Sequence, residues 1–209
     1  TAGSKSLFNL SDRDRMDNTV TYVTPSFAGV KVYAQYSFNR NGQEAAGNER
    51  NNDRYAALGA KYELGAFSTG LVVDTVLNKN PTAGNTEDSL GVTWGASYDF
   101  GVAKLYVATQ YFKDSDLCVG QIDDTQNAGQ FDGFGLSVGA GVPAFGGTAK
   151  VLVGYMDAED QGTAAQDVQR YAFSVGYEYP LSKRTFLYGG AGYYMDSYDK
   201  VALEGHDDK

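Results

Sequence analysis

Few residues in this chain could carry out bond-making chemistry. The only histidine, His206, lies in a polar tail, so a histidine general base is not available elsewhere in the chain. The single cysteine, Cys118, can form neither an intrachain disulfide nor a cysteine-based zinc site. Charge is what the sequence offers instead, in a dense cluster at residues 12–15 and at alternate positions of several apolar segments. We therefore expect no enzymatic activity, no cofactor and no bound metal.

The charged residues alternate with apolar residues in a two-residue period. From Val30 to Phe38, for example, apolar side chains at the even positions oppose Lys31, Tyr33 and Gln35 at odd positions. This period is typical of a β-strand with one apolar and one polar face. The charges that the alternation places on polar faces are Lys31, Lys61, Glu63, Asp74, Asp99, Lys104, Lys150, Arg170 and Glu178.

The same alternation predicts ten strands, of which 170–179 and 185–195 are the clearest. The ten are 17–24, 30–38, 54–63, 67–76, 90–100, 103–112, 131–142, 148–156, 170–179 and 185–195. Short turns are predicted at 25–29, 64–66, 101–102, 143–147 and 180–184, and long polar loops at 39–53, 77–89, 113–130 and 157–168. Residues 197–209 are predicted to be a polar tail.

Short turns and long loops alternate along the chain, which puts all short turns at one end of the sheet. Strands of about ten residues with this loop pattern are typical of an up-and-down outer-membrane barrel rather than a soluble sandwich. The chain contains 26 Gly and 16 Tyr and has no apolar run long enough for a transmembrane helix. The sequence thus predicts an all-β fold, an antiparallel up-and-down transmembrane β-barrel.

Two features indicate that the apolar face meets lipid and the polar face lines water. Gly and Ser fill the opposite face of residues 131–142, and aromatic residues gather near strand ends, as at Tyr98, Phe100, Tyr177 and Tyr179. A soluble barrel with its apolar face inward is the alternative. The formal net charge of −9 argues against a nucleic-acid partner.

Three stretches of the sequence resemble the general porins of the Gram-negative outer membrane. They are Arg15–Tyr22 with Pro25–Gly29, Gly95–Tyr106, and Leu181–Thr185 with Leu187 and Tyr188. The resemblance implies a trimeric, sixteen-stranded barrel, of which this chain would supply about ten strands. Residues 1–209 would then be a single-domain barrel fragment that lacks the N-terminal strands and the closing C-terminal strand.

The resemblance also implies a function and a site. It implies a water-filled channel for passive diffusion of small hydrophilic solutes and ions, whose charged constriction screens those solutes. The implied partners are two further copies in a homotrimer, outer-membrane lipid and lipopolysaccharide, in the cell outer membrane. The family often has a basic residue at position 21 and a polar one at 23, where this chain has Thr21 and Val23. The constriction candidates are Asp12, Arg13, Asp14 and Arg15.

Several alternatives remain open on the sequence. The cluster at 12–15 is equally well explained as a solvated linker, and the charges on the polar faces as pairs that simply solvate a wet wall. A surface barrel without a channel, either adhesive or structural, is the alternative function.

Overall fold

The ten expected strands form one continuous antiparallel sheet. The computed structural model describes residues 16–40, 51–79, 87–115, 130–161 and 166–200. The strands lie side by side in chain order, so the predicted all-β, up-and-down antiparallel fold is confirmed. They are β1 (Thr19–Val23), β2 (Val30–Ser37), β3 (Arg54–Leu64), β4 (Phe67–Leu77), β5 (Ser89–Asp99), β6 (Lys104–Ser115), β7 (Phe131–Ala144), β8 (Gly147–Asp160), β9 (Gln166–Ser182) and β10 (Thr185–Lys200).

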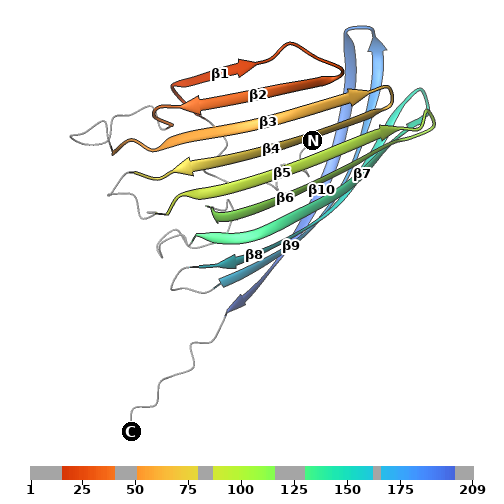
Figure 1. The fold of residues 1–209 in the computed structure, drawn as a ribbon. Coiled ribbons are helices and arrows are strands. Elements are labelled where there is room, and N and C mark those ends of the chain that lie inside the picture. The colour runs from red at the N-terminus through yellow and green to blue at the C-terminus, as the bar shows by residue number, and fades with distance from the viewer. Residues whose placement is uncertain (1–15, 41–50, 80–86, 116–129, 162–165, 201–209) are drawn as a thin grey trace.

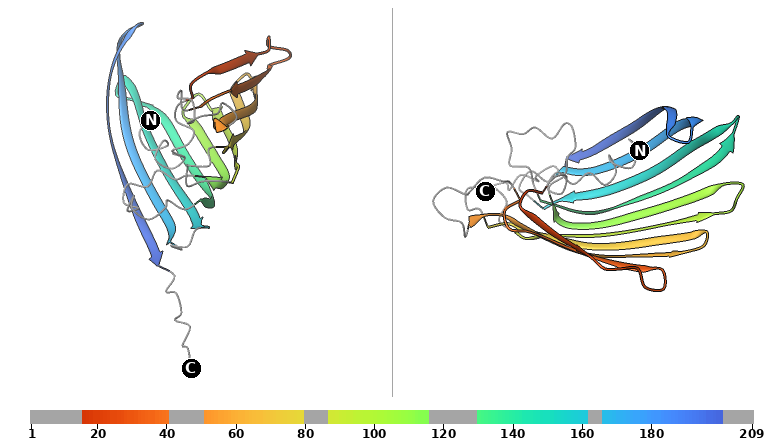
Figure 2. Two further views of the ribbon diagram at one scale, coloured as in Figure 1. Left: turned by 90° about the vertical axis from the view of Figure 1, so that its left-hand side faces the viewer. Right: turned by 90° about the horizontal axis from the view of Figure 1, so that it is seen from above.

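The sheet is a curved trough whose two outer strands are β1 and β10 (Figure 1). All short turns lie at one end of the trough, as Figure 2 shows from two sides, and the strand ends that the longer connections join lie at the other. In the described part of the chain, β1 and β10 each pair with one neighbour only. No helix within the described residues has the length and apolar character needed to cross a bilayer.

The pairing register fixes which side chains share a face. A single row of paired residues runs from β2 to β10 through Lys31, Lys61, Gly70, Gly95, Ala108, Ser137, Gly154, Ala172 and Tyr194. Residues of this face line a concavity of about 1330 Å³ on the inside of the curve. The other face carries half-exposed large apolar side chains, among them Leu58, Leu71, Trp94, Leu136 and Phe173.

Several boundaries differ from the expected ones at the long-loop end, among them the end of β6, which runs to Ser115 instead of 112. β8 runs to Asp160 and β9 begins at Gln166, so the loop expected at 157–168 is mostly strand. The alternation continues beneath the acids here, because Met156 and Ala158 are buried on the inner face while Asp157 pairs with Gln169 on the outer face. β10 likewise continues to Lys200, so the polar tail expected from Ser197 begins later.

The turn between β9 and β10 is shorter than expected, as are the turns expected at 64–66 and 143–147. Pro180 and Leu181 belong to β9, which leaves Lys183 and Arg184 as the turn into β10. Proline is tolerated because β8 pairs with β9 only as far as Glu178, so no strand on that side needs an N–H from Pro180.

The turn between β7 and β8 shows how sequence sets a hairpin. Its two central residues, Phe145 and Gly146, have φ of 50° and 80°, as a type I′ turn requires. The Tyr177 hydroxyl lies 2.9 Å from the carbonyl oxygen of Ala144 and 3.0 Å from that of Phe145. The neighbouring strand therefore ties down this turn.

A small apolar cluster lies on the inner face toward the long-loop end. The residues share near-complete burial and come from β6 to β9: Phe112, Phe131, Met156, Ala158, Val168 and Ala172, with Leu152 packed against them. The alternation predicts an inner face of mainly small and polar residues, and this apolar cluster differs from that prediction.

Candidate functional site

The candidate site is the charged inner wall of the trough. The register places all nine of the charges expected on polar faces on this one face. They form two groups, one near the short turns and one near the longer connections. The four constriction candidates, Asp12, Arg13, Asp14 and Arg15, lie outside the described residues.

The group near the short turns contains two exposed ion pairs. Lys61 Nζ lies 2.8 Å from Glu63 Oε1 on the same strand, and both side chains are about half exposed. Lys150 Nζ lies 2.8 Å from Glu178 Oε2 on the adjacent strand. These pairs fix the positions of the charges but add little stability, because solvent screens them.

Lys31, Lys104 and Asp99 complete this group. Lys104 is the cross-strand partner of Asp99 in the register of β5 and β6, and its ammonium group lies 5.5 Å from the centre of the Tyr106 ring. Lys31 is the direct cross-strand partner of Lys61. The short-turn half of the inner face in β2 to β9 thus carries four lysines and three carboxylates.

Small residues separate these charges. Gly141 lies between Lys104 and Lys150 in one row, and Gly70 and Gly95 follow Lys61 in another. Because glycine has no side chain, the surface of the sheet beside these lysines is open.

The group near the long-loop end is buried and tightly paired. Arg170 donates from Nε to Asp196 Oδ1 at 2.6 Å and from Nη2 to Oδ2 at 2.7 Å. Its guanidinium lies 4.8 Å from the centre of the Tyr194 ring. Asp196 was not among the expected site residues, since it falls just beyond the predicted strand. The charge at position 170 is therefore neutralised locally rather than presented to the concavity.

Asp74 belongs to the same buried group. Its carboxylate lies over Gly91, its cross-strand partner, with Oδ1 2.8 Å from the position that a Cβ at Gly91 would occupy. The absence of a side chain at Gly91 leaves the space that this carboxylate fills. Nearby, Gln110 is buried and donates from Nε2 to Thr93 Oγ1 at 2.8 Å.

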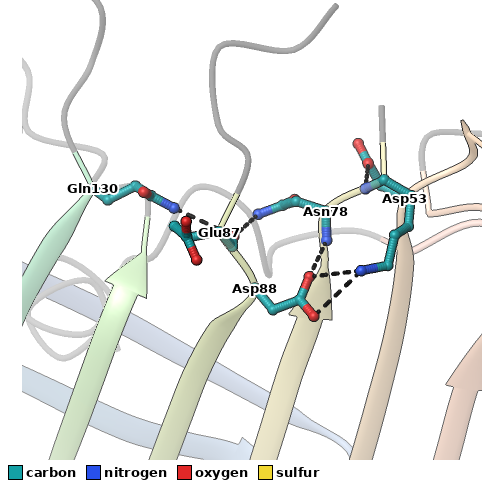
Figure 3. Close-up of polar contacts among 6 residues, drawn as sticks. Asp53, Asn78, Glu87, Asp88 and Gln130 are labelled. Carbon is teal, nitrogen blue, oxygen red and sulfur yellow. Dashed lines mark hydrogen bonds and ion pairs between the residues drawn. The ribbon is translucent and has the colours of Figure 1, made fainter. Parts of the chain in front are cut away.

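A polar network ties the strand ends together at the long-loop end (Figure 3). The Asp88 carboxylate accepts a hydrogen bond from the Asn78 amide N–H at 3.0 Å and pairs with Lys79 Nζ at 3.3 Å. The backbone carbonyl of Glu87 accepts from Asn78 Nδ2 at 2.6 Å and from Gln130 Nε2 at 3.3 Å. These residues lie in stretches expected to be loop, so this network could not be predicted from the sequence.

The described residues contain no group of three or more acidic, histidine or cysteine side chains placed to hold a metal ion. What the inner wall offers is therefore a set of fixed charges over small residues, with hydroxyls from Ser68 and Ser97 in the same region. Such an arrangement can attract, repel and orient charged solutes.

Comparison with known proteins gives relatives of one kind. The chain is 32% identical over 202 residues to an outer membrane porin protein of Bordetella pertussis, covering 86% of this chain and 52% of the relative. It is 30% identical over 179 residues to outer membrane porin protein 32 of Delftia acidovorans, covering 86% of this chain and 46% of the relative. The chain thus spans about half the length of these relatives.

Solved structures agree on the fold. An anion-selective porin from Comamonas acidovorans superposes with a TM-score of 0.63 at 26% identity, covering 87% of this chain and 49% of that one. A loop-deletion mutant of OmpT, an outer membrane protein of Vibrio cholerae, gives a TM-score of 0.67 at 18% identity, covering 91% and 61%.

A model of the Gram-negative porin family matches residues 1–199. The expectation of a porin rather than an enzyme is confirmed, because the family model and the relatives are porins. The expected outer-membrane location is confirmed by the same relatives. The chain belongs to the Gram-negative porin family of the outer membrane.

Proposed function

We propose that this chain supplies ten consecutive strands of a longer barrel that encloses a water-filled channel. Small hydrophilic solutes and ions would cross it by passive diffusion. The observation that carries the proposal is the single register across all ten strands, with small and charged residues on one face and large apolar residues on the other. This division is what a wall between lipid and water requires.

The exposed apolar face supports a membrane setting over a soluble barrel. Trp94, Leu136 and Phe173 are 39%, 43% and 49% exposed on the convex side of the trough. Contiguous apolar surface of this kind is unfavourable in water and favourable against lipid. A soluble barrel would turn the same side chains inward, toward the concavity, where the register instead places glycine, serine and charge.

A weak preference for anions is a second part of the proposal. The four lysines and three carboxylates of the short-turn half leave an excess of positive charge on that part of the wall. The structurally similar porin from Comamonas acidovorans is itself described as anion-selective. We infer a modest rather than a strict preference, because exposed charges are screened at physiological salt.

The complete protein would work as a homotrimer in outer-membrane lipid and lipopolysaccharide, and it would have no nucleic-acid partner. Among the described residues β1 and β10 each have one unpaired edge, which supports the idea that further strands close the barrel, because unpaired edges are unfavourable within a bilayer.

Single-channel recording on the complete protein in planar bilayers tests this function. We expect stepwise openings in groups of three with ohmic conductance, and a reversal potential under a KCl gradient that indicates anion preference. A protein that inserts fully folded yet passes no current would overturn the channel and favour an adhesive or structural surface barrel.

A further inference from the structure

Two lysines on the inner wall face each other without a carboxylate between them. Lys31 on β2 and Lys61 on β3 are direct cross-strand partners, so their Cβ atoms are about 4.5–5.5 Å apart. Like charges directly opposite each other destabilise a sheet. The pairing is therefore unfavourable unless something else balances the charge.

The described chain balances this charge only in part. Glu63 pairs with Lys61 at 2.8 Å, and its carboxylate also lies within electrostatic reach of Lys31 and Lys104. Glu63 is thus shared between Lys61 and Lys31, whereas Lys104 also has Asp99 as its cross-strand partner. Lys31 has no ion-pair partner of its own among the described residues.

There is room for an anion beside Lys61, which lines the concavity. Gly70 follows Lys61 in the same row and Gly95 follows Gly70, so neither position covers the ammonium groups. Ser68 and Ser97, the next partners along from Glu63, provide hydroxyl donors over the same concavity. Lys61 is about half exposed to that space.

We propose that Lys31 and Lys61 form a binding site for the doubly charged phosphate group of a diffusing solute, at the short-turn end of the channel. A phosphate monoester carries about −1.5 to −2 charges at neutral pH and three strong acceptor oxygens, so it can accept hydrogen bonds from both ammonium groups at once. Lysine binds phosphate as a compact point charge, and an exposed site of this kind would bind weakly enough to release the solute. The proposal rests on the proposed channel function, because the site lies on its inner wall.

The test uses the complete protein in planar bilayers with KCl, titrated with inorganic phosphate at pH 7.5 from the short-turn side. We expect phosphate to reduce the chloride current saturably, and the double variant K31Q/K61Q to weaken its apparent affinity about tenfold. The matched control K113Q/K183Q removes two lysines that lie off this wall and should leave the phosphate titration unchanged.

A third variant is expected to strengthen phosphate binding instead of weakening it. Glu63→Gln removes the one carboxylate near the pair, so phosphate should bind several-fold more tightly, which a merely structural role would not produce. Suppose that the wild-type channel conducts and that phosphate inhibits K31Q/K61Q and the control variant equally. The phosphate site is then wrong, while the channel stands. If the folded wild-type protein does not conduct at all, the proposed channel itself is overturned.

Discussion

The guanidinium of Arg170 on β9 is held by the carboxylate of Asp196 on β10 in a two-point contact of 2.6 and 2.7 Å. Both side chains are nearly buried, at 4% and 11% exposure. Burying a charge is costly unless it is paired and hydrogen-bonded, so each member of the pair makes the other's burial possible. The face of the guanidinium lies over Tyr194, which adds a cation–π contact.

Removing one member of this pair should therefore destabilise the protein. We expect Asp196→Ala to lower the free energy of unfolding by about 3 kcal/mol, because it leaves a buried guanidinium without its carboxylate. Urea-induced unfolding of the complete protein in lipid vesicles measures the change. The double variant R170M/D196L should lose much less than Asp196→Ala; a loss as large as that of the single variant would show that the pair itself is not what matters.

The turn between β7 and β8 gives a second prediction. A Cβ at Gly147 would collide with the carbonyl oxygen of Glu178 and lie 2.7 Å from the Tyr177 hydroxyl. Gly147→Ala should therefore cost about 1–3 kcal/mol of stability in the same unfolding assay. Gly95→Ala is the control, since a Cβ there meets its nearest atom at 3.6 Å. Equal effects at the two glycines would contradict this account.

Tyr177 itself should contribute through its hydroxyl. Tyr177→Phe removes the hydrogen bond to the turn carbonyls of Ala144 and Phe145 while keeping the ring. A single hydrogen bond of this kind contributes about 0.5–1.5 kcal/mol net. Tyr179→Phe removes a hydroxyl that makes no hydrogen bond in the described structure, and it should be close to neutral. The prediction fails if both variants unfold at the same urea concentration.

The strand order and the two faces could be predicted from the sequence because both follow from a period of two residues. Alternation around Lys31, Lys61 and Lys150 assigned these lysines to one face without knowledge of strand neighbours. The ends of the strands could be predicted less well. The two-residue alternation continues through Asp157 and Ser197, but their polar side chains are typical of a loop. Only the pairing with β9 shows that both residues belong to strands.

The partner of Arg170 could not be predicted for a more specific reason. A bulge between Thr185 and Phe186 shifts the β9–β10 register by one residue. Without that shift Ser197, not Asp196, would lie opposite Arg170, and β10 would turn its other face to the concavity. One irregularity in a short turn thus decides a contact near the far end of the hairpin.

The network at the long-loop end should act locally. Asp88→Ala removes the acceptor of the Asn78 amide and the partner of Lys79. Lys79 and Asp88 are each more than 40% exposed, so we expect a change of at most about 1 kcal/mol in global stability. Hydrogen exchange at the Asn78 amide should nevertheless become faster. An unchanged exchange rate there would show that Asp88 does not hold the strand end.

The two members of an inner-wall ion pair should shift the ion preference of the channel in opposite directions. Lys150 and Glu178 form one such pair at 2.8 Å, and both line the concavity. Glu178→Gln removes a negative charge from the wall, so the anion-to-cation permeability ratio should rise, whereas Lys150→Gln should lower it. Reversal potentials of the complete protein under a KCl gradient measure both shifts, which should shrink at high salt because of screening. Asp157→Asn removes an acid from the outer face of β8 and should shift the ratio far less than Glu178→Gln. A shift of the same size in Asp157→Asn would mean that the ions respond to net protein charge rather than to the inner wall.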